Sequence, residues 1–134
     1  MIETPINCLF DTTVFIDYWR GRASARAIIE RSLNGELLGG FSILTDLELW
    51  VGVRDDRDAR DHITMLSPYR RYPLNVTIAR RSGELARIYR ANNMSIPDLI
   101  IASTAEFYGL TLVSRNTSDF STLVEDDLIE LITY

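Results

Sequence analysis

A short, almost wholly apolar run near the N-terminus is the feature that most constrains the fold of this chain. Residues 6–10 (INCLF) have the composition of a strand that is buried on both faces, as in a parallel sheet. Asp11 follows this strand directly, and residues 14–20 have the composition of the first turns of a helix. Because ligands bind at the carboxyl ends of the strands in open α/β sheets, Asp11 is the first candidate site residue.

Helices and short apolar strands alternate along the rest of the chain. Helices are expected over residues 23–34, 43–53, 75–92 and 99–108, and strands over residues 37–41, 110–114 and 128–132, with a further short strand within 69–74. This alternation predicts an α/β fold in which helices cover both faces of a mostly parallel sheet. At 134 residues, the chain is expected to form a single domain over residues 1–134.

Composition excludes several kinds of site. Cys8 is the only cysteine and His62 the only histidine, so neither an internal disulfide nor a zinc site built from cysteine and histidine can form. Cys8 is expected to be a buried, inert thiol, and His62 an ordinary surface residue at the end of a solvated charged run over 54–61. No apolar run is long enough to span a membrane and no leader is recognisable, so a cytoplasmic protein is expected.

The basic residues give the chain an unusual charge pattern. The net charge of −5 argues weakly against a protein that holds nucleic acid by bulk electrostatics alone. All 14 basic residues are arginine, and none is lysine. Arginine suits bidentate contacts with phosphate, which is consistent with an RNA-binding rim, but a genome rich in arginine codons would produce the same bias.

Glu48 is the second candidate acid. On the helix expected over 43–53, Leu44, Leu47 and Val51 form an apolar stripe at spacings of three and four, and Glu48 falls in its middle. A carboxylate inside an apolar stripe is costly unless it is paired or bound to a metal. Glu48 is therefore a better site candidate than Asp46, which points the opposite way into solvent.

Two further acids lie where helices and strands begin or end. Asp98 falls in a first helical turn after Pro97, where the helix dipole favours a charged carboxylate and hence a bound cation, although a plain capping charge is the alternative. Asn116 and Asp119 follow the strand over 110–114 and offer further oxygen ligands, whereas the acidic run over 125–127 is expected to be a solvated turn.

These acids are expected to converge at one edge of the sheet. Several carboxylates in one poorly solvated pocket repel each other unless cations neutralise them. Mg²⁺ or Mn²⁺ suits ligands that are all oxygen. The chemistry that follows from such a site is metal-assisted hydrolysis of a phosphodiester.

Four ordered segments carry a resemblance to a known family. Residues 10–19 (FDTTVFIDYW), 42–52 (SILTDLELWVG), 96–105 (IPDLIIASTA) and 112–120 (LVSRNTSDF) are similar to the successive motifs of the PIN-domain family, especially its VapC-like toxins. The resemblance implies a three-layer α/β/α sandwich and an Mg²⁺-dependent ribonuclease. It also implies the toxin of a type II toxin–antitoxin pair, with RNA as substrate, an antitoxin as partner and a homodimeric state.

The resemblance also implies roles for individual residues. Asp11 and Asp98 would be the principal metal ligands and Glu48 a third acid. The family has an acid or amide at the position of either Asn116 or Asp119, and Asp119 is favoured here as the fourth acid, with Asn116 assisting. The family usually has asparagine or serine two residues after its first aspartate, whereas this chain has Thr13. This departure could weaken a hydrogen bond that orients the ligand, although a threonine hydroxyl can serve the same purpose.

Other classes remain as alternatives to a nuclease. Phosphoacceptor receiver domains and phosphatases of the haloacid-dehalogenase type also use acids at strand ends, but both normally need a lysine, which this chain lacks. The stronger rival is a catalytically inactive PIN-like scaffold that binds RNA or protein. An interface with a second copy or an antitoxin is expected to use part of a set of apolar side chains, Phe15, Trp19, Leu49 and Trp50; the alternative is that they complete the core.

Overall fold

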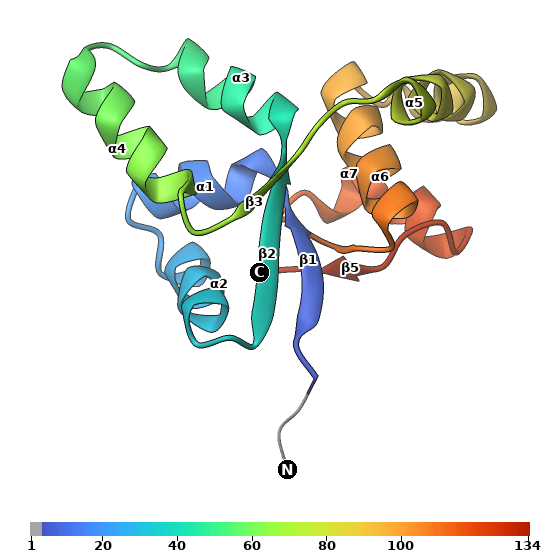
Figure 1. Cartoon of the computed structure of the whole chain (residues 1–134). Helices are drawn as coiled ribbons and strands as arrows, with labels where there is room; N and C mark the ends of the chain where they lie inside the picture. The colour runs from blue at the N-terminus through green and yellow to red at the C-terminus, as the bar shows by residue number, and fades with distance from the viewer. Residues whose placement is uncertain (1–3) are drawn as a thin grey trace.

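A five-stranded sheet forms the centre of the molecule (Figure 1). The computed structural model describes residues 4–134. The strands are β1 (Ile6–Phe10), β2 (Leu37–Ser42), β3 (Arg70–Tyr72), β4 (Thr111–Val113) and β5 (Leu131–Ile132), in the spatial order β3-β2-β1-β4-β5. Every neighbouring pair of these strands is parallel, so the sheet is parallel throughout. All their carboxyl ends therefore lie at one edge.

Helices cover both faces of this sheet, which confirms the predicted α/β/α architecture (Figure 1). One layer consists of α1 (Thr12–Trp19), α2 (Ala23–Leu33), α3 (Ile43–Val51) and α4 (Asp56–Leu66). The other consists of α5 (Val76–Ile88), α6 (Ile96–Tyr108) and α7 (Thr117–Glu125). A short 3₁₀ turn, Arg90–Asn92, follows α5 in place of the continuous helix expected over 75–92. No helix within residues 4–134 is long and apolar enough to cross a membrane.

The central strand β1 contributes side chains to both hydrophobic cores. Its last three residues are completely buried, as the apolar run predicted. Cys8 and Phe10 pack into the core beneath α1 to α4, whereas Leu9 packs into the core beneath α6 and α7. Because successive residues of a strand point to opposite faces, one short run supplies two cores. Burial raises the pKa of the Cys8 thiol to about 11, so the expectation of an inert thiol is supported.

An aromatic cluster joins the strands to the first helical layer. The rings of Phe10, Phe15 and Tyr69 lie edge to face with centroids 5.4 to 5.9 Å apart, and Phe15 meets Phe41 at 5.9 Å. Phe15 is completely buried in this cluster and Leu49 is buried in the same core. These two residues therefore complete the monomer's own core, whereas Trp19 and Trp50 of the same set are exposed.

Helix ends follow the capping residues that the sequence offers. The Ser42 hydroxyl accepts from the Leu44 N–H at 3.1 Å at the start of α3, and Asn75 accepts from the Ile78 N–H at 2.8 Å at the start of α5. Gly109 adopts φ 65° at the end of α6, a conformation that glycine reaches without strain. The segment expected to be a loop after β4 turns into α7 at Thr117.

The charged run over 54–61 lies mainly on a helix. Its residues from Asp56 onward form α4, which Asp55 caps by accepting from the Asp58 N–H at 2.8 Å. Asp58 is buried and accepts from Arg54 Nε at 2.8 Å. His62 is also buried, so the prediction of a surface histidine is wrong: its ring stacks on Trp19, with centroids 4.7 Å apart.

Asp17 is a fully buried acid that sequence reasoning did not single out. Its carboxylate accepts from Arg115 Nε at 2.8 Å and from the Tyr134 hydroxyl at 2.9 Å, and Arg22 Nε lies 3.5 Å away. These partners supply the charge and hydrogen bonds that a buried carboxylate needs. The network ties α1 to the segment after β4 and to the C-terminal residue.

We expect Gly40→Ala to destabilise the protein by about 2 kcal/mol, because its neighbours leave no room for a side chain. A Cβ at Gly40 would clash with the Tyr72 ring and lie 2.9 Å from the carbonyl oxygen of Arg70 on the adjacent strand. The free energy of unfolding, measured by urea titration, tests this. Gly83→Ala is the control, since it meets nothing within 4 Å and should stabilise exposed α5 by about 0.5 to 1 kcal/mol. Equal shifts for both variants would contradict this account of the sheet.

Candidate active site

The four predicted acids come from separate elements that meet at the carboxyl edge of the sheet. Asp11 follows β1, and Glu48 lies on α3, which begins directly after β2. Asp98 and Asp119 occupy the first turns of α6 and α7, the latter being the helix that follows β4. Because β2, β1 and β4 are adjacent in the sheet, the connections that leave them are neighbours in space.

The electrostatics of Asp98 and Asp11 indicate that the four carboxylates lie close together. Burial raises the pKa of Asp98 to about 6, and the negative charges of Asp11, Asp119 and Glu48 raise it further, whereas a hydrogen bond with Ser95 opposes the shift. Burial also raises the pKa of Asp11, and Asp119 adds to that shift. The negative charges of the other three acids therefore make ionisation of Asp98 less favourable.

Hydroxyl groups hold Asp11 in position. The Ser114 hydroxyl donates to Asp11 Oδ2 at 2.7 Å, and the Thr13 hydroxyl donates to the same oxygen at 3.0 Å. Thr13 thus makes the kind of hydrogen bond that an asparagine or serine would supply. Ser114 was missed by sequence reasoning, although the signal was available: it ends the strand expected at 110–114, and a parallel partner of residues 6–10 would bring it beside Asp11.

A second pair of hydroxyls holds Glu48. Thr12 Oγ1 donates to Glu48 Oε1 at 2.9 Å and lies 2.9 Å from Thr45 Oγ1. Since the single Thr12 proton is used on Glu48, the Thr45 hydroxyl donates to Thr12. Both threonines are buried. Sequence reasoning assigned neither of them to the site, although Thr45 precedes Glu48 by three residues and so shares its helix face.

The reason given for Glu48 from the sequence was partly wrong. The stripe of Leu44, Leu47 and Val51 does not face the core: Leu47 and Val51 are exposed, and α3 buries Thr45 and Leu49 instead. Glu48 is half-buried beside Thr45, where its partner is a hydroxyl rather than an apolar stripe. Asp46 accepts from Arg71 Nε at 2.6 Å at the surface and is not part of the site.

Asp98 and Asp119 line a cavity of about 260 Å³. Ser95 and Ser118 also line it, and Ser95 caps α6 by accepting from the Asp98 N–H at 3.2 Å. Asn116 precedes α7, and its N–H donates to Ser114 Oγ at 3.0 Å. The loop that carries Asn116 and Asp119 is thereby tied to the same serine that orients Asp11.

The donor set fits a hard divalent cation. All the convergent ligands are carboxylate oxygens, which Mg²⁺ and Mn²⁺ prefer, and a cation would relieve the repulsion that raises the pKa of Asp98. Within residues 4–134, however, no three histidine, cysteine or acidic side chains form a ready-made metal cage. The acids are gathered at one edge but are not closed around a single point.

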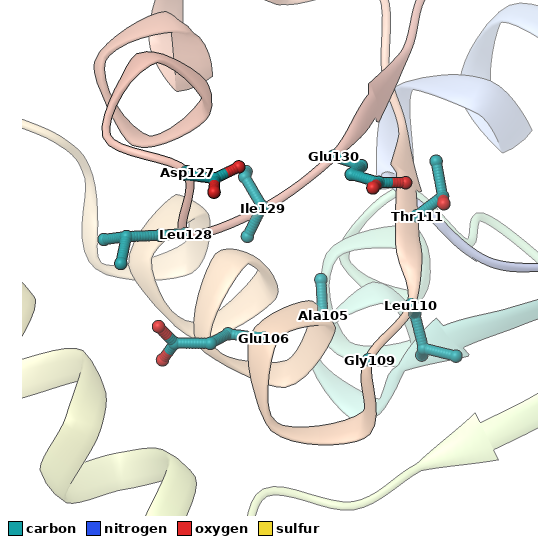
Figure 2. A pocket seen from close by; sticks show the side chains of 9 residues that line it. All are labelled: Ala105, Glu106, Gly109, Leu110, Thr111, Asp127, Leu128, Ile129 and Glu130. Atoms are coloured by element: carbon teal, nitrogen blue, oxygen red, sulfur yellow. The ribbon is translucent and has the colours of Figure 1, made fainter.

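A second acidic pocket lies elsewhere and is separate from this site (Figure 2). It has a volume of about 280 Å³ and is lined by Glu106, Asp127 and Glu130 among others. It adjoins Gly109 and Thr111, at the amino end of β4, so it faces away from the carboxyl edge. Figure 2 shows the three acidic side chains spread around the pocket rather than meeting at one point.

Comparisons with known proteins agree with this arrangement. The family described as the PIN domain matches residues 8–124, which is most of the chain and includes all four acids. The chain belongs to the PIN domain family. Ribonuclease VapC10 of Mycobacterium tuberculosis is 32% identical over 115 residues, which cover 84% of each protein. Ribonuclease VapC19 of the same organism is 33% identical over 114 residues, or 84% of this chain and 90% of that protein.

Solved structures show the same PIN fold. A chain of a toxin–antitoxin complex from Klebsiella pneumoniae is similar at a TM-score of 0.77 with 29% identity, over 94% of this chain and 96% of that one. A chain of VapBC2 from Rickettsia felis, bound to a DNA fragment from its promoter, is similar at a TM-score of 0.80 with 16% identity. That likeness covers 96% of this chain and 99% of the other.

The raised pKa of Asp98 predicts how metal-free stability depends on pH. Folding favours the protonated carboxyl, so this contribution is fully present below pH 4 and is lost as the pH rises through about 6. We therefore expect Asp98→Asn to raise the free energy of unfolding at pH 7.5 by about 1 kcal/mol, after allowance for solvent screening, and to have little effect at pH 4.

Urea titration in EDTA at these two pH values measures the difference. Asp61→Asn, which alters an exposed acid on α4, is the matched control. A stability change for Asp98→Asn that is the same at both pH values would contradict the prediction.

Proposed function

We propose that this protein is an Mg²⁺-dependent ribonuclease that hydrolyses phosphodiester bonds of RNA, with Mn²⁺ as an alternative cation. The observation that carries the proposal is the electrostatic coupling of four acids from separate elements at the carboxyl edge of the sheet. Relatives named as ribonucleases, of similar length and above 30% identity, support the same activity.

In this proposal Asp11 and Asp98 are the principal cation ligands, and Glu48 and Asp119 are further acids of the same site. The cation, when bound, would activate water and stabilise the charge that develops on the phosphate. The protein's own residues prepare the site: Ser114 and Thr13 hold one oxygen of Asp11, and Thr12 holds one oxygen of Glu48. Asn116 supports the loop that carries Asp119. The raised pKa values of Asp11 and Asp98 describe the protein before a cation is bound.

The biological role that we propose is the toxin of a type II toxin–antitoxin pair that acts in the cytoplasm, where its RNA substrate occurs. The relative from Klebsiella pneumoniae, at 29% identity, belongs to a toxin–antitoxin complex. By analogy, a cognate antitoxin protein would bind this chain and hold it inactive. An inactive PIN-like scaffold remains the alternative, but the hydrogen bond from Thr13 to Asp11 weakens the sequence argument for it.

We also propose that the protein is a homodimer. The outer face of α3 carries large apolar side chains, among them Leu47, Trp50 and Val51, and it lines a groove of about 590 Å³ with almost no polar surface. A continuous apolar face of this kind on a helix is typical of a surface that a partner covers. A second copy of the chain would bury it symmetrically.

RNA cleavage tests the proposed activity. We expect wild-type protein to cleave single-stranded RNA with Mg²⁺ and to lose activity in EDTA. Asp11→Asn and Asp98→Asn should each lower the cleavage rate at least 100-fold, because removal of a ligand charge weakens cation binding and the stabilisation of phosphate charge. Asp61→Asn should cleave at the wild-type rate.

Cation binding gives this proposal a readout apart from activity. Mn²⁺ should raise the melting temperature of wild-type protein in proportion to the logarithm of its concentration, and should not do so for the double Asn variant of Asp11 and Asp98. Equal cleavage by wild type and both single variants would exclude the proposed site.

A charge placed on the α3 face tests the homodimer. We expect Leu47→Glu to convert the dimer to a monomer in light scattering, with an unchanged circular dichroism spectrum, because the dimer would have to bury the new carboxylate. Ile63→Glu on α4 is the matched control, since Ile63 and Leu47 are 59% and 60% exposed. Monomeric wild-type protein at micromolar concentration, or an equal response of both variants, would contradict the proposal.

A further inference from the structure

A pocket of about 480 Å³, lined by residues of α1, α3 and α4 and of the segment between α3 and α4, adjoins the acidic site. Its lining includes Trp19, Arg20, Arg54, Asp58 and His62, and one wall is formed by Glu48. The pocket and the acidic site therefore share a residue. The volume of this pocket is in the range of pockets that hold small ligands. Neither the four acids nor the apolar face of α3 accounts for the aromatic and basic groups gathered in it.

Trp19 is held as a rigid platform in this pocket. Its indole stacks on the imidazole of His62, with centroids 4.7 Å apart and an angle of 25° between the planes. His62 Nδ1 in turn donates to the carbonyl oxygen of Asp58 at 2.7 Å, which fixes the imidazole on α4. Trp19 is nevertheless 44% exposed. A large aromatic ring that is fixed but accessible can stack a ligand at little cost in side-chain entropy.

Two guanidinium groups flank this platform. Arg54 Nε lies 2.8 Å from Asp58 Oδ2, so the base of α4 anchors its guanidinium although most of the side chain is exposed. Arg20 follows Trp19 directly and is exposed. Guanidinium groups bind phosphate oxygens in a fork geometry, and aromatic rings stack unpaired bases. The two kinds of group together fit a nucleotide.

We propose that this pocket binds one unpaired nucleotide of the RNA substrate, next to the phosphodiester that is cleaved. The base stacks on Trp19, and a backbone phosphate lies between Arg20 and Arg54. The base must be unpaired because the faces of a base in a duplex are already covered by its neighbours. The inference rests on the proposed ribonuclease function and adds to it a position for the substrate and a preference for single-stranded RNA.

RNA is favoured over a protein segment as the occupant of this pocket. A protein partner that covers a helix needs a broad apolar face, and α3 offers that face at Leu47, Trp50 and Val51, outside the pocket. The pocket instead combines the stacked rings of Trp19 and His62 with two guanidinium groups, of which that of Arg54 is paired with Asp58. Its Glu48 wall belongs to the proposed hydrolytic site. A cleaving enzyme needs a contact of this kind to hold the chain on one side of the scissile bond.

The test compares two aromatic side chains of similar exposure, one inside the pocket and one outside it. Binding of a fluorescent single-stranded RNA is measured in EDTA with Asp98→Asn protein, so that no cleavage occurs. We expect Trp19→Leu to raise the Kd about tenfold, because one base loses its stacking partner, and Trp19→Phe to raise it less. Phe107→Leu is the control, since Phe107 is 49% exposed on α6 and lies outside both the pocket and the apolar face of α3. A duplex RNA should not distinguish the two leucine variants.

Salt dependence separates the stacking contact from the phosphate contact. Arg20→Gln should reduce the slope of log Kd against log salt concentration by about one, whereas Trp19→Leu should leave the slope unchanged. Melting temperatures of all variants show whether the Trp19 substitution disturbs α4 through His62. Loss of RNA binding that is restored by Trp19→Phe supports the platform even if Trp19→Leu is less stable.

The outcomes distinguish this inference from the proposed function. If wild-type protein cleaves RNA but Trp19→Leu and Phe107→Leu bind it equally, the pocket does not hold a nucleotide and the ribonuclease proposal stands. If Trp19→Leu weakens binding of a protein partner and leaves RNA binding unchanged, the pocket is a protein-docking site and the inference is overturned. If wild-type protein neither binds nor cleaves RNA, both proposals fail.

Discussion

The structure depends on the burial of β1 between two layers of helices. Its side chains alternate between the two cores, so this short strand fixes the sheet to both helical layers at once. The chain then leaves the sheet at Asp11, which carries a carboxylate into a largely water-free position. Burial is the largest cause of the raised pKa of that carboxylate. The burial that stabilises the fold thus also makes ionisation of Asp11 less favourable.

Hydroxyl groups orient the acids without neutralising their charge. Ser114 and Thr13 donate to Asp11, and Thr12 donates to Glu48, so these carboxylates are oriented by neutral partners. An arginine in the same place would have neutralised them, as Arg115 does for the buried Asp17 on the far side of α1. The contrast separates two kinds of acid in one small domain: Asp11 and Glu48 have hydroxyl partners, whereas Asp17 is paired with arginine.

The sequence predicts the sheet, and the positions of Asp11, Asp98 and Asp119 at the ends of strands or helices, because both follow from local patterns. Short apolar runs that end in polar residues identify buried strands, and acids placed at strand and helix ends need no knowledge of distant contacts. Burial of Asp17 and His62 could not be predicted in this way. Asp17 depends on partners 98 and 117 positions away in the sequence, and His62 depends on a ring of another helix. The apolar spacing on α3 was equally ambiguous, because a core face and a partner-binding face have the same period.

Cys8 has a practical consequence for the study of this protein in solution. It is the chain's only cysteine, it lies completely buried in β1, and its pKa of about 11 keeps the thiolate scarce at neutral pH. A cysteine introduced on the surface would therefore be the single group that reacts with maleimide reagents. Fluorophores or spin labels could be attached at one chosen position while every native residue of the core stays unchanged.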